Sequence, residues 1–158
     1  MKKGVAGVLS AVVGGMAGGV AVGVKSNKEV KKWRGFSNKH LEMIKLYDQW
    51  FATKQEGKSV VDYLKSEGIK TVAIYGMSFV GQRLYEELRD TDIEVKYGID
   101  KNWAKIYADI DVVGMEDELE EVDAIIVTAF SFFDEIEEIL MEKTDNRILS
   151  IEDIIYAL

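Results

Sequence analysis

TVAIYGMSFVGQRLYEEL, residues 71 to 88, is the stretch that decides the fold of this chain. Its first five residues form a short apolar run, which predicts a buried strand. Residues 79 to 89 carry Val80, Leu84 and Leu88 at four-residue steps, which predicts a helix with one apolar face. The stretch therefore predicts a strand, a tight turn and a helix in succession.

The turn itself follows the G-x-G-x-x-G pattern of dinucleotide-binding turns, with one change. Gly76 and Gly81 take the first and third places, and Ser78 takes the second, where a glycine lets a pyrophosphate approach the backbone. The turn shape is expected to survive this change, whereas the clearance for a phosphate is narrowed. The amides at the start of the helix would still favour an anion, and the serine hydroxyl could donate to a phosphate.

The rest of the chain continues the alternation of strand and helix. Residues 37 to 54 repeat apolar side chains at helical spacing, which predicts a helix with Ser37 as its N-cap and a stop at Gly57. A second, short helix follows, in which Ser59 and Asp62 have capping-box spacing and which ends at Gly68. Further strands are predicted at residues 94–99, 112–113, 124–128 and 147–150, and further helices at 132–143 and 151–158. This alternation predicts an α/β, Rossmann-like doubly wound parallel sheet of about five strands in the order 3-2-1-4-5.

Charge divides the chain into two parts. Residues 1 to 35 carry seven basic side chains and one acid, Glu29. Because the whole chain has 20 basic and 28 acidic side chains, 13 basic and 27 acidic ones remain for residues 36 to 158. An acidic domain repels phosphate backbones, so no nucleic-acid partner is expected. The boundaries predicted from these patterns are an anchor at 1–35, a helical lead-in at 36–69 and the Rossmann-like domain at 70–158.

The segment between Lys3 and Lys25 has 21 residues without a charge. As a helix it would be about 31 Å long, enough to cross a bilayer once. Five basic residues follow it within ten positions, which predicts a single-pass anchor in the inner (cytoplasmic) membrane with the domain in the cytoplasm. The alternative is a cleaved signal peptide and a secreted domain, although the apolar run is longer than a usual h-region.

Small residues recur every four positions along this segment. A helix would align them as one smooth stripe, which lets two membrane helices approach closely, so a homo-oligomer or a membrane-protein partner is predicted through Gly7, Ala11, Gly15, Gly19 and Gly23. The simpler interpretation is a marginally hydrophobic anchor without a partner, since glycine and alanine are common in membrane helices.

Two further residues complete the candidate nucleotide site. Asp100 lies 24 residues after Gly76 at the predicted end of the next strand, where an acid holds a ribose hydroxyl in dinucleotide-binding folds. Thr128 opens the loop TAFSFF at the carboxyl end of a central strand, where open α/β sheets bind ligands and where the loop aromatics could stack on a base. The alternative is that the glycines serve packing, that Asp100 caps a turn with Asn102, and that the loop aromatics pack under the last helix.

The segments AIYGMSFVGQRLYEEL, VKYGIDKN, IYADIDVVG and VDAIIVT, from residues 73 to 128, resemble small domains of bacterial surface-polysaccharide biosynthesis. These are the N-terminal domains of nucleotide-sugar epimerases and dehydratases and of sugar acetyltransferases. The resemblance covers about residues 70 to 155. It implies an NAD(P) or UDP-sugar ligand, and an acidic helix before the VDAIIVT strand. Ser78 and the pair Ile110-Asp111 depart from the glycines and proline of that pattern.

No catalytic set is recognisable in the sequence. Tyr97 and Lys101 have the spacing of a Tyr-x-x-x-Lys pair but straddle a strand end, where the two side chains do not share a face. The chain has no cysteine and one histidine, His40, so no metal is expected.

The sequence therefore predicts a membrane-anchored accessory protein that binds a nucleotide or nucleotide sugar and is not an enzyme on its own. The first alternative is a ligand-free structural or interaction module that oligomerises through its membrane helix. The second is a small NAD(P)-dependent reductase or epimerase fragment that takes a catalytic residue from a partner.

Overall fold

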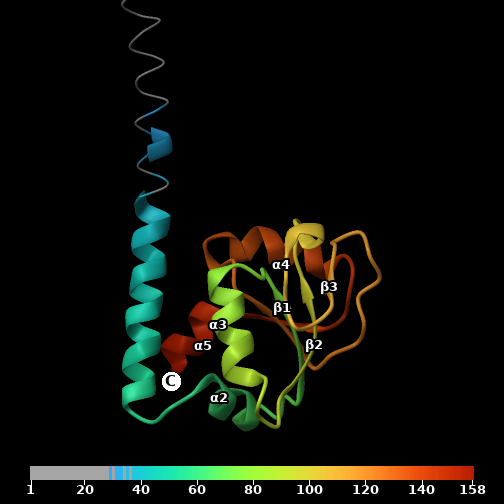
Figure 1. Ribbon diagram of the computed structural model, residues 1–158, viewed down its shortest axis with the longest axis horizontal. Coiled ribbons are helices and arrows are strands. Elements are labelled where there is room, and N and C mark those ends of the chain that lie inside the picture. Colours follow the sequence, from blue (N-terminus) through green and yellow to red (C-terminus); the bar gives the residue numbers. More distant parts are fainter. Residues whose placement is uncertain (1–28, 30, 34, 36) are drawn as a thin grey trace, which may run out of the picture. The chain divides into compact units, whose positions relative to one another are not determined.

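The computed structural model describes residues 29, 31–33, 35 and 37–158 (Figure 1). The predicted membrane segment and its stripe of small residues lie outside them. Within the described part, no helix is both long and apolar enough to span a bilayer. The chain divides into two compact units, Met1–Met43 and Ile44–Leu158, so that residues 44 to 69 of the predicted lead-in belong to the same unit as the sheet.

The first long helix ends as the sequence predicts but does not begin there. Residues 37 to 55 are helical, and so is Gly35, which places Ser37 inside the helix rather than at its N-cap. The helix stops at Gly57, whose φ of +77° is in the region that favours glycine. The amide of Lys58 bonds back to the carbonyl of Thr53 over a distance of 3.0 Å and closes the last turn.

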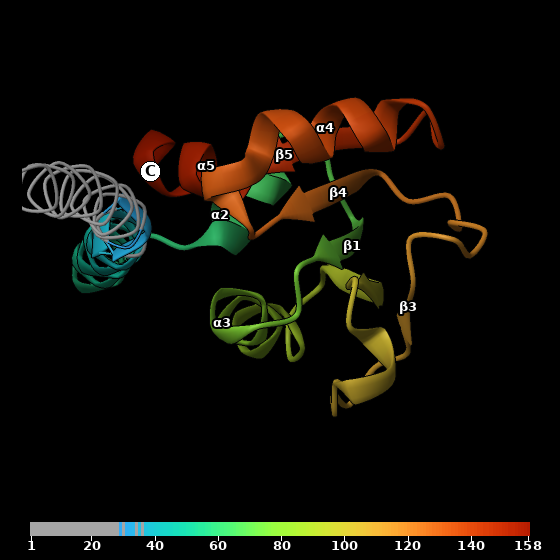
Figure 2. The same ribbon diagram turned by 90° about the horizontal axis from the view of Figure 1, so that it is seen from above.

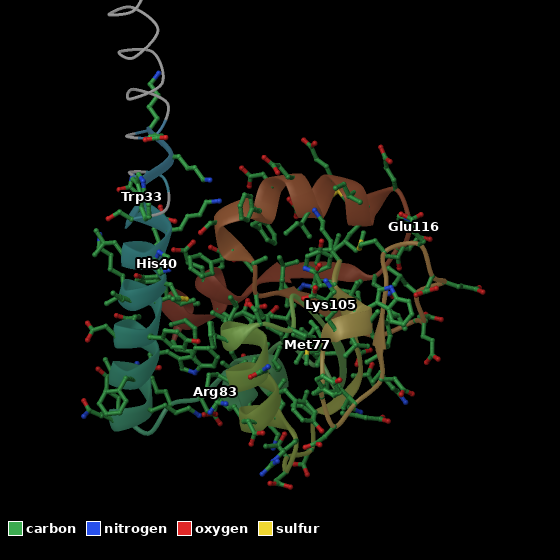
Figure 3. The ribbon with its side chains drawn as sticks, turned by 45° about the horizontal axis from the view of Figure 1, so that its top comes forward. Trp33, His40, Met77, Arg83, Lys105 and Glu116 are labelled. Carbon is green, nitrogen blue, oxygen red and sulfur yellow. The ribbon has the colours of Figure 1, made fainter. Side chains whose placement is uncertain are left out.

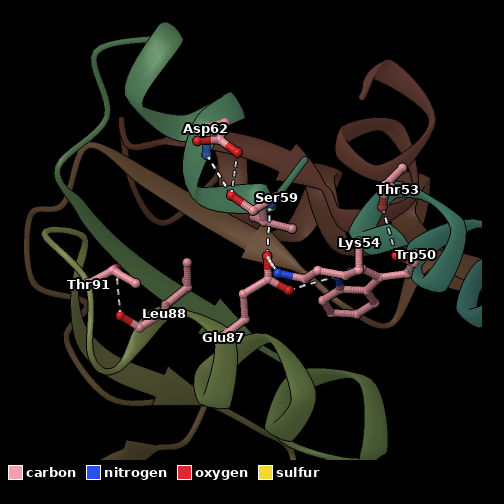
Figure 4. Close-up of polar contacts among 9 residues, drawn as sticks. Trp50, Thr53, Lys54, Ser59, Asp62, Glu87, Leu88 and Thr91 are labelled. Atoms are coloured by element: carbon pink, nitrogen blue, oxygen red, sulfur yellow. Dashed lines mark hydrogen bonds and ion pairs between the residues drawn. The ribbon is translucent and has the colours of Figure 1, made fainter. Parts of the chain in front are cut away.

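One carboxylate joins the end of this helix to two other helices (Figure 4). Glu87 accepts a hydrogen bond from Trp50 Nε1 at 2.9 Å and one from the Val60 amide at 2.9 Å, and it pairs with Lys54 at 2.6 Å. The Glu87 side chain is 9% exposed. Because a nearly buried carboxylate is stable only when its oxygens are satisfied, these three contacts fix the helix end within the second unit.

Helix α2 (Val60–Ser66) begins at the predicted cap. Ser59 is its N-cap residue, and its hydroxyl accepts from the amide of Asp62 at 3.2 Å. The Asp62 carboxylate accepts in turn from the Ser59 hydroxyl at 2.6 Å. The chain then turns at Gly68, which has a φ of +73°, and enters the sheet.

The sheet confirms the predicted class and strand order. All strand pairs are parallel, and the five strands lie in the order β3-β2-β1-β4-β5. Their bounds are β1 (Thr71–Tyr75), β2 (Glu94–Ile99), β3 (Val112–Val113), β4 (Ala124–Val127) and β5 (Arg147–Ser150). The strand order reverses direction between β1 and β4, which is the topological switch point of the sheet.

Helices cover both faces of the sheet. Helix α4 (Phe133–Met141) lies on one face, whereas α3 (Phe79–Leu88) and α5 (Ile151–Ala157) lie on the other together with α2, which contacts both of them (Figure 2). Strand β4 is fully buried along its length because it is central and covered on both sides. Two short 3₁₀ turns, η1 (Trp103–Lys105) and η2 (Phe130–Phe132), follow β2 and β4.

The acidic helix that the resemblance implies before β4 is not formed. Residues 115 to 123 have no helical backbone. The Asp117 carboxylate instead accepts from the Gly114 amide at 2.7 Å, which holds a turn just after β3. Several acids within a few residues repel one another in a helix, so an extended path is favoured.

Candidate functional site

The glycine turn follows β1 directly. Gly76 has a φ of +94°, and its amide donates to the carbonyl of Ile99 at the end of β2 over 2.8 Å. A Cβ at this position would lie 2.9 Å from Thr128 Oγ1. Both the backbone angle and the lack of space require glycine here.

Gly81 is required by a still closer approach. A Cβ on Gly81 would lie 2.1 Å from the carbonyl oxygen of Gly76, nearer than any side chain can come. The first turn of α3 therefore packs directly onto the end of β1. This is the packing role of the third glycine in the G-x-G-x-x-G pattern, and the structure supports that role for Gly81.

Ser78 differs from the two glycines because nothing in the backbone demands it. Its φ of −81° is open to any residue, and it is the N-cap residue of α3. Its hydroxyl makes no capping hydrogen bond, and its side chain is exposed. Of the three glycine positions of the motif, this is the only one that carries a side chain, and that side chain lies at the surface.

Asp100 ties the end of β2 to the glycine turn. Its Oδ2 accepts from the Met77 amide at 3.0 Å, and its Oδ1 accepts from the Asn102 amide at 2.8 Å. The turn-capping alternative for Asp100 is therefore present in the structure. Because the Met77 amide is already satisfied, a phosphate would have to use the amides further along the start of α3.

Thr128 lies behind the turn. It is 3% exposed, and its hydroxyl lies 3.0 Å from the Tyr75 carbonyl and 2.5 Å from that of Gly76. Its amide also donates to Tyr75 O at 2.9 Å. The side chain predicted to meet a cofactor thus holds β4 against the glycine turn and does not line the hollow described next.

A hollow opens at the carboxyl ends of β1, β2 and β4. Its volume is about 310 Å³. One wall is apolar and comes mainly from α4 and the turn before it, and the opposite wall carries polar groups of the glycine turn and the residues after β2. We call this hollow the switch-point hollow; it is lined by Tyr75, Gly76, Ser78, Asp100, Lys101, Asn102, Ala129, Phe132, Glu135, Ile136 and Ile139.

The electrostatics of the switch-point hollow are mixed. Asp100 and Glu135 contribute negative charge and Lys101 positive charge to its walls. Burial raises the pKa of the Tyr75 hydroxyl, and the nearby Asp100 carboxylate raises it further. Tyr75 therefore stays protonated at neutral pH and serves as a hydrogen-bonding group rather than a base.

Phe132 belongs to the loop TAFSFF, whose aromatic residues the sequence places at this edge of the sheet. The α4 residues Ile136 and Ile139, in contrast, were missing from the sequence predictions. Phe132, Ile136 and Ile139 lie at helical spacing, so the pattern was present, but an apolar face on a helix normally predicts only core packing. In the structure Ile136 is buried, whereas Phe132 and Ile139 are 43% and 40% exposed. Their exposure at the mouth of the hollow is a consequence of where α4 crosses the sheet.

No catalytic pair forms from the residues that the sequence offered. Tyr97 is 5% exposed and donates its hydroxyl to the Glu120 carbonyl at 2.7 Å, while Lys101 lines the switch-point hollow. Burial raises the pKa of Tyr97 to about 12. Among the residues that the structure describes, no group of three or more His, Cys, Asp or Glu side chains could hold a metal.

Comparisons with known proteins give no relative: no family model, curated protein or solved structure matches this chain.

Proposed function

We propose that this protein binds a nucleotide or nucleotide sugar in the switch-point hollow and acts as a membrane-anchored accessory protein of cell-surface polysaccharide synthesis. The observation that carries the proposal is a hollow of about 310 Å³ at the topological switch point, against the start of α3. Open α/β sheets bind ligands at this place. The pathway and the anchor come from the sequence predictions alone.

The two walls of the hollow suit the two halves of a nucleotide. The apolar wall from Ile136, Ile139 and Phe132 offers a surface on which a base can stack or pack. The polar wall offers Asn102 and Asp100 to ribose hydroxyls and Lys101 to a phosphate. The start of α3 adds amide donors and the positive end of the helix dipole.

We also propose that the protein has no catalytic activity of its own. The groups that line the hollow include no nucleophile with an adjacent base, and the buried Tyr97 hydroxyl is bonded to a backbone carbonyl. Such a pair is the minimal arrangement for covalent or acid-base catalysis. Turnover of a nucleotide sugar by the purified protein would contradict this part.

Calorimetric titration of the full chain with NAD, NADP and UDP-glucose tests the binding. We expect Ile139→Arg to weaken binding by about tenfold or more, because the charged side chain enters the apolar wall. Met141→Arg is the matched control, since Met141 is an exposed apolar residue of the same helix that does not line the hollow. Absence of binding to all three ligands, or equal effects of both variants, would overturn the proposal.

The variant Ser78→Gly distinguishes a nucleotide site in which the serine contacts the phosphate from a vestigial site in which the serine obstructs it. If the hydroxyl contacts a phosphate, the variant binds more weakly or equally well. If serine only obstructs the approach of the phosphate, the variant binds more tightly, because glycine restores the clearance. The φ of −81° means that neither residue strains the backbone, so the comparison reports on the ligand alone.

A ligand-free interaction module is the second candidate, and exposed apolar side chains favour it. Ile44 and Phe51, seven residues apart on one helix, are 61% and 65% exposed, and Phe79 is 72% exposed. Side chains of this size on a surface mark contact sites when they are contiguous. This candidate would be favoured if none of the ligands binds in the titrations and if the chain self-associates in a way that Phe51→Ser abolishes.

A further inference from the structure

A second hollow lies on the other side of the glycine turn. It has a volume of about 430 Å³ and opens between α3 and the loop that leads from η1 toward β3. Gln82, Arg83 and Glu86 line it from α3, and Tyr107 and Asp109 line it from the loop. Met77 forms its floor beside the turn; Arg83 and Met77 are labelled in Figure 3. We call it the α3 hollow.

The two hollows share the glycine turn as their common wall. Gly76 and Ser78 line the switch-point hollow, and Met77 between them lines the α3 hollow. The Met77 amide is held by Asp100, so the turn is fixed between the two spaces. A ligand with two parts joined by a short linker can therefore place one part on each side, with its linker over the start of α3.

The walls of the α3 hollow are polar and carry both donors and acceptors. Arg83 and Gln82 supply donors, and Glu86 and Asp109 supply carboxylate acceptors. In the part of the chain that the structure describes, Arg83 has no ion pair, whereas Glu86 pairs with Arg89 at 3.3 Å. Two carboxylates against one guanidinium disfavour a second phosphate in this hollow.

A polyhydroxylated ring fits this set of groups. Each hydroxyl of a sugar both donates and accepts, so it can bond to a guanidinium or amide on one side and to a carboxylate on the other. The Tyr107 ring, 97% exposed at the rim, offers an aromatic face for the C–H side of the ring. The switch-point hollow, with its apolar α4 wall, suits a base better.

We propose that the α3 hollow is a saccharide site, which holds the sugar of a nucleotide sugar whose nucleoside occupies the switch-point hollow and whose diphosphate crosses the start of α3. The inference rests on the proposed function, because it takes the nucleoside site as given. It selects a nucleotide sugar over a free nucleotide as the ligand.

Titrations with matched ligand pairs test the sugar site in the full chain. We expect UDP-glucose to bind about tenfold more tightly than UDP, or GDP-mannose more tightly than GDP, because the sugar adds its own contacts. Ala108→Trp fills the α3 hollow from the loop and should reduce each nucleotide sugar to the affinity of its nucleotide, while the affinity of the nucleotide stays the same. Ala104→Trp is the control, since Ala104 is exposed in η1 and does not line the hollow.

The outcomes separate the two proposals. If UDP and GDP bind but the sugar adds nothing, or if Ala108→Trp weakens nucleotide and nucleotide sugar equally, the sugar site is overturned and the nucleoside site stands. If no ligand of either pair binds, both proposals fall. The variant Asp109→Asn tests the same site without adding bulk, and it should lower the nucleotide-sugar affinity several-fold. Asp111 is an exposed acid of the same loop that does not line the hollow, so Asp111→Asn should leave this affinity unchanged.

Discussion

At the scale of single residues, the glycine turn separates packing from binding. Gly76 and Gly81 are glycines because a backbone angle and a carbonyl oxygen leave no space for a side chain. Ser78 meets neither constraint and faces the switch-point hollow. Of the three glycine positions of this six-residue motif, two therefore set the fold and one can contact a ligand.

Gly81→Ala should be among the most destabilising single-methyl changes in the domain. The added Cβ would lie 2.1 Å from the Gly76 carbonyl oxygen, so α3 must move off β1. We expect a loss of about 3 kcal/mol in the free energy of unfolding, measured by urea denaturation of the full chain. Gln82→Ala, its exposed neighbour in the same helix, should change stability by less than about 0.5 kcal/mol. Equal stability of the two variants would contradict the close approach.

At the scale of elements, Asp123 shows how a short strand pair is aligned. Its carboxylate accepts from the amides of Lys70 and Thr71 at 2.8 Å each, just where β1 begins, while its own amide bonds to Thr71. These backbone hydrogen bonds lower the pKa of Asp123 below its ordinary value of 3.8. The residue before β4 therefore fixes the start of β1, and the register of the central pair follows.

This contact gives the domain a defined acid sensitivity. A lowered folded-state pKa means that Asp123 stabilises the fold fully above pH 3.8 and that this contribution is lost as the pH falls through the folded value. Asp123→Asn should be less stable than the wild type at neutral pH and should lose less stability below pH 3.8. Urea midpoints measured across that range test the slope. Asp145→Asn, exposed and without a hydrogen bond in the described part, should leave the slope unchanged.

Elements were predicted most reliably where the pattern was local. The bounds of β1, β2 and β5 coincide with the predicted ones, because each is a short apolar or alternating run closed by glycine or polar residues. The start of the first helix was misplaced, since Ser37 can cap a helix but is helical here, as is Gly35 before it. A capping residue predicts a boundary only when the chain before it leaves the helix.

At the scale of the whole molecule, the chain is predicted to be a cytoplasmic domain on a basic, glycine-rich anchor. Deleting residues 1 to 24 should move the protein from the membrane fraction to the supernatant, because the 21 uncharged residues are the only stretch long enough to span a bilayer by sequence. The full chain should resist an alkaline wash that strips peripheral proteins. Recovery of the protein in the soluble fraction would contradict the anchor, and a soluble product shortened at its N-terminus would favour the cleaved signal peptide.

The sequence by itself determined the parallel α/β class, the strand order and the glycine turn, because periodicity, β-branched runs and the chirality of crossovers are local or follow fixed rules. Only the tertiary structure decided what the candidate residues touch. It turned Thr128 inward onto two carbonyls, engaged both oxygens of Asp100 with backbone amides, and left Ser78 exposed. It also brought Ile139 of α4 and Asp109 of a loop to the two sides of one turn. Such contacts join residues far apart in the chain, and a one-dimensional pattern carries no information on which of them meet.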